Sequence, residues 1–115
     1  MTNNSDFENE GESVEKHASE MSGPEAVAAG KPEFVKVLRA NVVREVSARL
    51  NVLENEIDQD THLIALGLDS LVLFSMTAQL AEWLERDLPA TLLFEINSIN
   101  ELIEQCVMLF FPENQ

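Results

Sequence analysis

Residues 34–50 read FVKVLRANVVREVSARL. Apolar side chains return every four positions through this stretch, and two valines stand beside them, which places all of them on one helical face. The recurring residues are Phe34, Leu38, Val42, Val46 and Leu50, accompanied by Val35 and Val43. The stretch therefore predicts an amphipathic helix of about four turns that buries one face in a core.

Two helices are expected in the middle of the chain. The first begins at Asp69-Ser70, because both residues are good N-caps, and no Gly or Pro interrupts it before Pro89. Pro89 suits the first turn of a short third element over Ala90–Glu95.

The last helix has the clearest pattern. It opens on Ser98-Ile99-Asn100-Glu101, a capping box, and Pro112 ends it. Its apolar stripe comprises Ile99, Leu102, Ile103, Cys106, Val107 and Phe110. No segment alternates as a strand. We expect an all-α fold, a four-helix bundle with three long helices and one short one.

An irregular segment, Asn51–Asp69, separates the first two helices. It carries five acidic residues, and loops of this length in a small domain are usually functional. It also contains apolar residues, which we expect to lie across the core: Leu53, Ile57, Leu63, Ile64 and Leu66.

The composition changes at Lys31-Pro32. Residues 1–32 hold seven acidic residues against two lysines, a net charge of −5, and one aromatic residue, Phe7. Such a segment buries too little apolar surface to offset its ordering entropy. We expect a disordered acidic leader over 1–32, at most transiently helical at Glu25–Ala29, followed by one domain over 33–115.

The charge balance restricts the class of partner. Twenty-one acidic residues against seven Lys and Arg give a formal net charge of −14, which disfavours nucleic acid and anionic membranes and favours a basic protein surface. The N-terminus has no signal-peptide pattern, and no apolar run is long enough to span a membrane. With a single cysteine there is no internal disulfide. A cytoplasmic protein is expected.

Few residues suggest independent catalysis. His17 and His62 have no partners at zinc-ligand spacing, and Cys106 falls on the apolar stripe of the last helix. The alternating loop carboxylates Glu54, Glu56, Asp58 and Asp60 lack the glycine and the final glutamate of a calcium loop. We expect neither an enzyme nor a metal site.

One segment, Gly67-Leu68-Asp69-Ser70-Leu71, stands where the long loop meets a helix N-terminus. Glycine permits a sharp approach, Asp69 can cap the exposed amides, and Ser70 then projects its hydroxyl from the first turn. A phosphodiester there would lie at the favourable end of the helix dipole. The residues alone leave two interpretations open: a serine that holds a phosphate group, and an ordinary capping serine.

Residues 60–71 (DTHLIALGLDSL) resemble the modification site of acyl carrier proteins, and residues 88–95 (LPATLLFE) resemble the third-helix region of polyketide-synthase carrier domains. The resemblance extends over about residues 33–110. It implies that a phosphopantetheinyl transferase attaches 4′-phosphopantetheine from coenzyme A to Ser70, supported by Gly67, Asp69 and Leu71. Acyl or polyketide intermediates would then be carried as thioesters by a non-catalytic protein.

The resemblance also implies partners acting in trans. These are the transferase, an acyltransferase or ligase, a ketosynthase and tailoring enzymes. The start at Met1 and the absence of a second domain suggest a discrete carrier, expected as a monomer, and an excised module would look the same. Peptidyl carriers commonly read Gly-Gly-His-Ser, whereas this chain has Gly67-Leu68-Asp69 before Ser70. The alternatives are an aminoacyl or peptidyl carrier of nonribosomal peptide synthesis and a helical adaptor without a prosthetic group.

Two apolar stripes run along the second helix. By the resemblance, Leu73, Met76, Leu80 and Leu84 face the core. The predicted partner surface then consists of Leu71, Val72, Phe74 and Ala78. Periodicity alone also allows Leu71 and Phe74 to be core residues. Trp83 is expected in the core or covering it.

Overall fold

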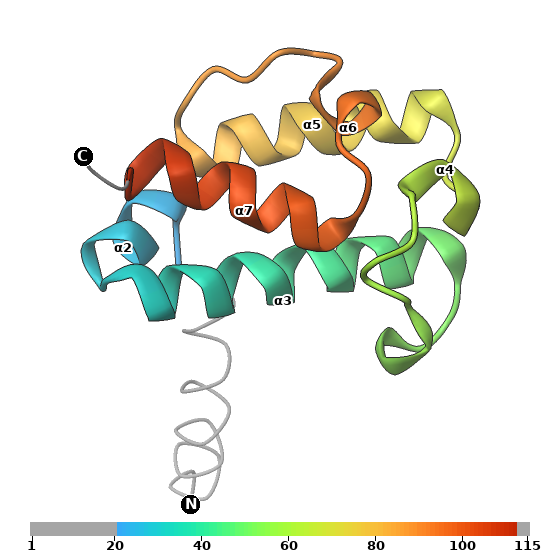
Figure 1. Cartoon of the computed structure of the whole chain (residues 1–115), viewed down its shortest axis with the longest axis horizontal. Coiled ribbons are helices and arrows are strands. Elements are labelled where there is room, and N and C mark those ends of the chain that lie inside the picture. Colours follow the sequence, from blue (N-terminus) through green and yellow to red (C-terminus); the bar gives the residue numbers. More distant parts are fainter. Residues whose placement is uncertain (1–20, 113–115) are drawn as a thin grey trace, which may run out of the picture.

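The computed structural model describes residues 21–112, and within this range every regular element is helical. Three long helices, α3 (Lys31–Leu50), α5 (Ser70–Leu84) and α7 (Ile99–Phe110), lie side by side (Figure 1). The shorter elements are α2 (Gly23–Ala28), η1 (Glu54–Glu56), α4 (Leu63–Leu66) and α6 (Leu92–Glu95). The expected all-α bundle, with three long helices and a short one between the last two, is confirmed.

Helix α3 buries the face that its four-residue repeat predicts. Phe34, Leu38 and Val46 are fully buried, and Val37 is a further core residue that the repeat does not include. A buried side chain of this size contributes about 1.5–3 kcal/mol. The helix ends at Asn51, which adopts a left-handed conformation with φ 58°.

Helices α5 and α7 supply the other two walls of the core. Leu73, Met76 and Leu84 of α5 are buried, whereas Leu80 is only half-buried. The buried residues of α7 are Ile99, Leu102, Ile103 and Cys106. Leu93 of α6 closes the core between them.

The start of α7 departs from a complete capping box. Ser98 Oγ accepts a hydrogen bond from the Glu101 amide at 3.1 Å, as predicted. The Glu101 carboxylate accepts from the amide of Asn97 at 2.9 Å. It therefore binds the amide of Asn97, the residue before the N-cap, and not that of the N-cap itself. Asn97 belongs to the connection between α6 and α7.

The short third helix begins later than its sequence suggests. It starts at Leu92, and Pro89 lies outside it. The Pro89 carbonyl accepts a hydrogen bond from the Leu92 amide at 3.0 Å, so Pro89 is the first residue of a turn that leads into the helix.

Residues 21–32 correct the expected domain boundary. They form α2 and the first residues of α3, with Ala26 completely buried. Ser22 and Glu25 make a full capping box, and the Trp83 indole N–H donates to the Met21 carbonyl at 2.8 Å. A tertiary contact and a strong cap thus outweigh the polar composition of this segment. Residues 1–20, the rest of the predicted leader, and residues 113–115 lie outside the described residues.

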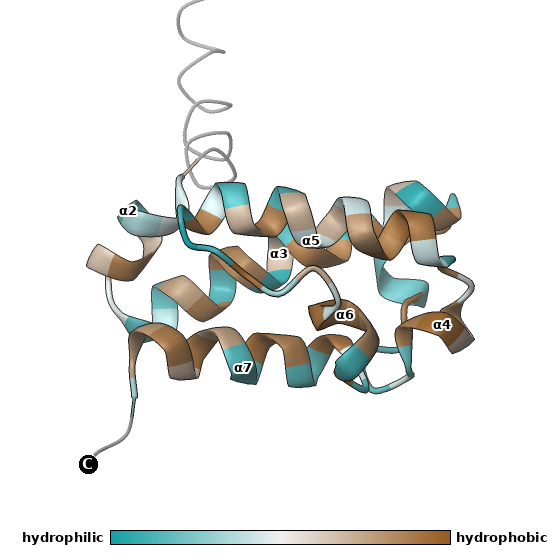
Figure 2. Cartoon of the chain, turned by 90° about the horizontal axis from the view of Figure 1, so that it is seen from above, coloured by the Kyte–Doolittle hydropathy of each residue, from teal (hydrophilic) through white to brown (hydrophobic). Residues whose placement is uncertain are grey.

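The segment between α3 and α5 is anchored to the core at three points. Ile57, Leu63 and Leu68 are buried, but Leu53 is 63% exposed and Ile64 47% exposed. The expectation that all its apolar residues lie across the core was therefore wrong for Leu53 and Ile64. Figure 2 shows α4 and α6, both largely hydrophobic, in the same half of the molecule.

A polar cluster fastens this segment to α3 and α7. One guanidinium nitrogen of Arg39 donates to Gln59 Oε1 at 2.6 Å and to Asn100 Oδ1 at 2.5 Å. The Asn100 side chain then donates to the Asp60 carboxylate at 2.6 Å. Because hydrogen bonds to charged groups are the stronger ones, this cluster holds the long segment in one arrangement.

Candidate functional site

The approach to Ser70 is set by the short helix α4. His62 Nδ1 accepts from the Ile64 amide at 3.1 Å and so caps its start. Gly67 ends it in a left-handed conformation with φ 115°, which favours glycine strongly. The reversal directs Leu68 into the core, where it is buried. Leu68 therefore anchors the chain immediately before the site.

Asp69 then caps helix α5. Its carboxylate accepts from the Val72 amide at 2.9 Å, and its carbonyl accepts from the Leu73 amide at 3.0 Å. Ser70 is the first residue of α5 and is exposed. Within residues 21–112 its hydroxyl has no hydrogen-bond partner, so the Oγ atom is available to solvent and to an enzyme.

These features fit a phosphodiester on Ser70. The first turn of a helix leaves amide groups without intrahelical partners, and the helix dipole favours negative charge there. The Asp69 carboxylate accepts a hydrogen bond from the Val72 amide, so the positive end of the helix dipole stabilises its negative charge. The accessible hydroxyl and the helix start together suit a covalently attached phosphate.

The surface beside Ser70 is apolar. Leu71 is 77% exposed, and Phe74 is 42% exposed with its ring centroid 5.1 Å from that of Phe94 on α6. Ile64 of α4 adds a further exposed side chain. We call Ile64, Leu71 and Phe74 the apolar surface; α5 carries no charged residue before Glu82.

The predicted partner residues are mostly exposed. Leu71, Phe74 and Ala78 are exposed, whereas Val72 is half-buried and packs against the core. Leu71 and Phe74 are therefore not core residues. Sequence periodicity missed Phe94, because its position beside Phe74 depends on how α6 packs against α5.

The cysteine and the described histidine have structural roles: Cys106 is buried, and His62 caps a helix. Burial raises the pKa of Cys106 from 9.0 to about 11, so its thiol stays neutral at ordinary pH. His62 serves as a helix cap, and His17 lies outside the described residues. Residues 21–112 contain no cluster of three or more metal-ligating side chains. None of the helices in that range is both long and apolar enough to cross a membrane.

A comparison with protein-family models matches residues 40–106 to the phosphopantetheine attachment site family. The match covers more than half of the chain, and the protein belongs to this family. It is a phosphopantetheine-carrying carrier protein, with 4′-phosphopantetheine as its prosthetic group. Such carriers are non-catalytic and are substrates of phosphopantetheinyl transferases, which decides against an adaptor without a prosthetic group.

Comparisons with curated proteins and with solved structures gave no significant match.

Proposed function

We propose that Ser70 is the attachment point and that the chain carries acyl intermediates of polyketide type as thioesters. The observation that carries the assignment of Ser70 is a comparison of the four serines within residues 40–106. Ser47 is half-buried and donates to the Val52 carbonyl, Ser75 is half-buried, and Ser98 is buried as a helix cap. Ser70 alone among these four is exposed.

The chain's own part in the attachment is to present one nucleophile. Ser70 Oγ forms a bond to a phosphorus atom of coenzyme A, the bond from that phosphorus to the nucleotide part breaks, and the hydroxyl proton passes to a base of the transferase. No histidine or carboxylate of this chain has to accept the proton. The two residues before Ser70 position it: Leu68 is buried in the core, and Asp69 caps the start of α5.

The prosthetic group supplies a thiol that forms thioesters with acyl groups. The chain contributes a fixed anchor, because Ser70 begins a helix that packs along the core. Tethering raises the local concentration of an intermediate at each partner enzyme without any new contact.

The partners would dock on the surface around Ser70. We infer that the interface comprises Leu71, Phe74 and Ala78, with Val72 contributing only its exposed edge. Ile64 extends it onto α4. The partners are the transferase, an acyltransferase or ligase, a ketosynthase and tailoring enzymes acting in trans on a cytoplasmic monomer. Docking through the apolar surface predicts partner enzymes with an apolar patch beside their active-site entrance.

The polyketide assignment is supported by residues 88–95 and by Gly67-Leu68-Asp69 before the serine. A second candidate, an aminoacyl or peptidyl carrier, differs in the enzyme that loads it. An adenylating enzyme that charges the holo-protein with an amino acid, in preference to any acyltransferase, would favour this second candidate.

The test is the intact mass after incubation with coenzyme A, Mg²⁺ and a broad-specificity transferase. We expect a gain of one phosphopantetheine in the wild type and none in Ser70→Ala. Ser75→Ala is the matched control, because it removes a hydroxyl from the same helix at a half-buried position. Retained modification in Ser70→Ala, or its loss in Ser75→Ala, would contradict the assignment of Ser70.

A further inference from the structure

The basic residues of the described chain are gathered on one helix. Of the six lysines and arginines within residues 21–112, five belong to α3. The sixth, Arg86, follows α5 and holds its guanidinium carbon 4.7 Å from the centre of the Phe110 ring. In a protein with a formal net charge of −14, α3 is therefore a local concentration of positive charge.

Two of the five cations on α3 already have partners. Arg49 pairs with Glu45 at 2.9 Å, and Arg39 belongs to the polar cluster at the start of α7. Lys36 and Arg44 are exposed, and neither forms a salt bridge within the described part of the chain. These two side chains are thus available to a carboxylate from elsewhere.

Lys36, Ala40 and Arg44 follow one another at intervals of about one helical turn, and all three are exposed. They lie on the outer side of α3, because α5 and α7 pack on its other side (Figure 1). We call these three residues the basic strip. Its two charged residues are about 12 Å apart along the helix axis, and the small alanine leaves the space between them open. Glu33, which is half-buried, lies on the same side but before the strip begins.

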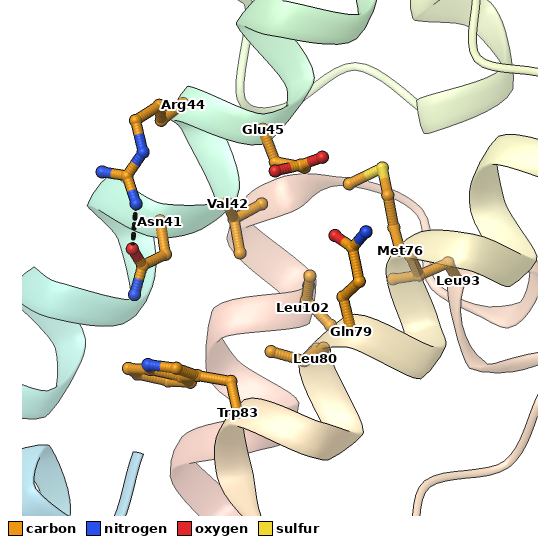
Figure 3. A pocket seen from close by; sticks show the side chains of 10 residues that line it. All are labelled: Asn41, Val42, Arg44, Glu45, Met76, Gln79, Leu80, Trp83, Leu93 and Leu102. Carbon is orange, nitrogen blue, oxygen red and sulfur yellow. Dashed lines mark hydrogen bonds between the residues drawn. The ribbon is translucent and has the colours of Figure 1, made fainter. Parts of the chain in front are cut away.

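Arg44 keeps most of its hydrogen-bonding capacity. Its guanidinium donates to Asn41 Oδ1 at 2.5 Å, so the Asn41 amide nitrogen faces the side of Trp83 (Figure 3). That nitrogen is buried and makes no hydrogen bond within residues 21–112. Because a guanidinium has five N–H donors, Arg44 can bind a carboxylate and hold Asn41 at the same time.

The N-terminal segment, residues 1–20, joins the folded domain beside the basic strip. The carbonyl of Met21, the first described residue, accepts a hydrogen bond from the Trp83 indole at 2.8 Å. Trp83 lines the same pocket as Asn41 and Arg44, and Figure 3 shows Asn41 between the other two. The chain that precedes Met21 therefore starts close to Arg44.

The N-terminal segment carries the charge opposite to that of the basic strip. It has six acidic residues against one lysine, a net charge of −5, and Glu8, Glu10 and Glu12 stand at every second position. In an extended chain, which rises about 3.3 Å per residue, Glu8 and Glu12 are about 13 Å apart, close to the spacing of the strip. Glu12 stands nine residues before Met21, and nine residues span up to about 30 Å. The acidic run therefore has the whole strip within reach.

We propose that the basic strip of α3 is a docking site for the N-terminal segment of the same molecule, with Glu8, Glu10 and Glu12 as the carboxylates that Lys36 and Arg44 bind. Docking within one molecule benefits from an effective concentration of about millimolar, so surface ion pairs of modest strength are sufficient. The docked segment covers the outer side of α3 and leaves the start of α5 open. The inference does not depend on the cargo or on modification of Ser70.

The test attaches a nitroxide spin label to the full, unmodified chain at Ser13→Cys. Cys106 is buried, so the new cysteine takes the label, and intact mass verifies a single addition. NMR then measures the paramagnetic relaxation of the backbone amides of Lys36, Ala40 and Arg44. We expect this relaxation to fall about fivefold between about 10 mM and about 1 M salt, because the Debye length falls from about 30 Å to about 3 Å.

Two double variants separate the basic strip from the net charge. Lys36→Gln/Arg44→Gln removes both charges of the strip, and we expect the ratio of docked to undocked molecules at low salt to fall about fivefold. Lys31→Gln/Arg86→Gln is the matched control, because it also removes two exposed cations. Lys31 stands five residues before Lys36 and so projects from another face of α3, and Arg86 lies outside that helix. This control should keep the relaxation of the wild type.

Three results would overturn the inference. Relaxation of the strip amides that is independent of salt, or unchanged in Lys36→Gln/Arg44→Gln, would mean that the segment does not dock there. An equal loss in Lys31→Gln/Arg86→Gln would mean that net charge, and not the strip, attracts the segment. Spin-labelled molecules are also mixed with unlabelled ¹⁵N-enriched ones, and relaxation of the strip in the enriched molecules would assign the strip to a second copy of the chain.

Discussion

Replacing Gly23 by alanine tests whether α2 belongs to the folded domain. A Cβ atom at this position would lie 2.6 Å from the Trp83 carbonyl oxygen and 2.8 Å from the Leu84 Cα atom. Both are backbone atoms of α5, which cannot move away as the end of a flexible side chain can. Gly23→Ala must therefore strain this contact or release α2 from the bundle.

The loss of unfolding free energy in Gly23→Ala has an upper limit, because α2 can detach from the bundle. Overpacking of this kind costs about 1–3 kcal/mol. Detachment forfeits the Trp83–Met21 hydrogen bond, about 1 kcal/mol, and the burial of Ala26, about 0.8 kcal/mol. Partial burial of Met21 and Val27 adds roughly 1 kcal/mol. The two routes together bound the loss of unfolding free energy at about 2–3 kcal/mol, which lowers Tm by roughly 8–24 °C.

The assay is thermal unfolding by far-UV circular dichroism, with Trp83 emission recorded at low temperature. We expect a lower Tm in Gly23→Ala and a red-shifted emission, because loss of the α2 contact exposes the indole. Ala28→Ser is the control, since it also adds one heavy atom to α2 but at an exposed position. An unchanged Tm and emission in Gly23→Ala, or an equal loss in Ala28→Ser, would refute the packing argument.

Four further perturbations address the site and the core. Gly67→Ala places a Cβ on a residue with φ 115°, and we expect a loss of about 1–2 kcal/mol in denaturant unfolding with Ser70 still modified. Asp69→Ala removes the α5 cap and should cost about 1 kcal/mol, whereas Asp69→Asn, which retains an acceptor, should cost less. Burial raises the pKa of Cys106 from 9.0 to about 11, so the folded state favours the neutral thiol. Its contribution to stability is then intact below pH 9 and falls by about 2–3 kcal/mol as the pH rises to about 11, a loss absent from Cys106→Ala in unfolding measured across that range. Phe74→Glu should lower partner turnover about tenfold, while helicity and modification of Ser70 stay unchanged.

Each of these has an outcome that contradicts it. Full stability in Gly67→Ala would mean that the turn before Leu68 tolerates a side chain. An equal loss in the two Asp69 variants would mean that the carboxylate, and not the cap acceptor, stabilises α5. Alkylation of Cys106 in the native protein at neutral pH would contradict its burial. Normal turnover of Phe74→Glu, or loss of its helicity, would contradict docking through the apolar surface.

Local rules were sufficient for the three long helices. The four-residue repeat from Phe34, the caps at Asp69 and Ser98, and the position of Pro112 act within one or two turns, so they can be read without the rest of the chain. The same locality identified Ser70 as the first residue of a helix after a glycine turn.

Sequence reasoning failed where burial depended on a distant partner. Composition indicated a solvated segment up to residue 32, but Trp83 lies 62 positions from Met21 and supplies the contact that holds α2. Leu53 and Ile64 are exposed because neither lies at one of the three points where their segment is anchored to the core.

The sequence by itself determined the helical class, the starts of α5 and α7 and the serine at the start of α5, because capping and periodicity are short-range effects. Only the tertiary structure decided that α2 belongs to the fold, that Phe74 meets Phe94, and that Asn41 keeps an unpaired amide beside Trp83. These features depend on which side chains from separate helices meet, and that is set by packing of the whole core and not by any local stretch.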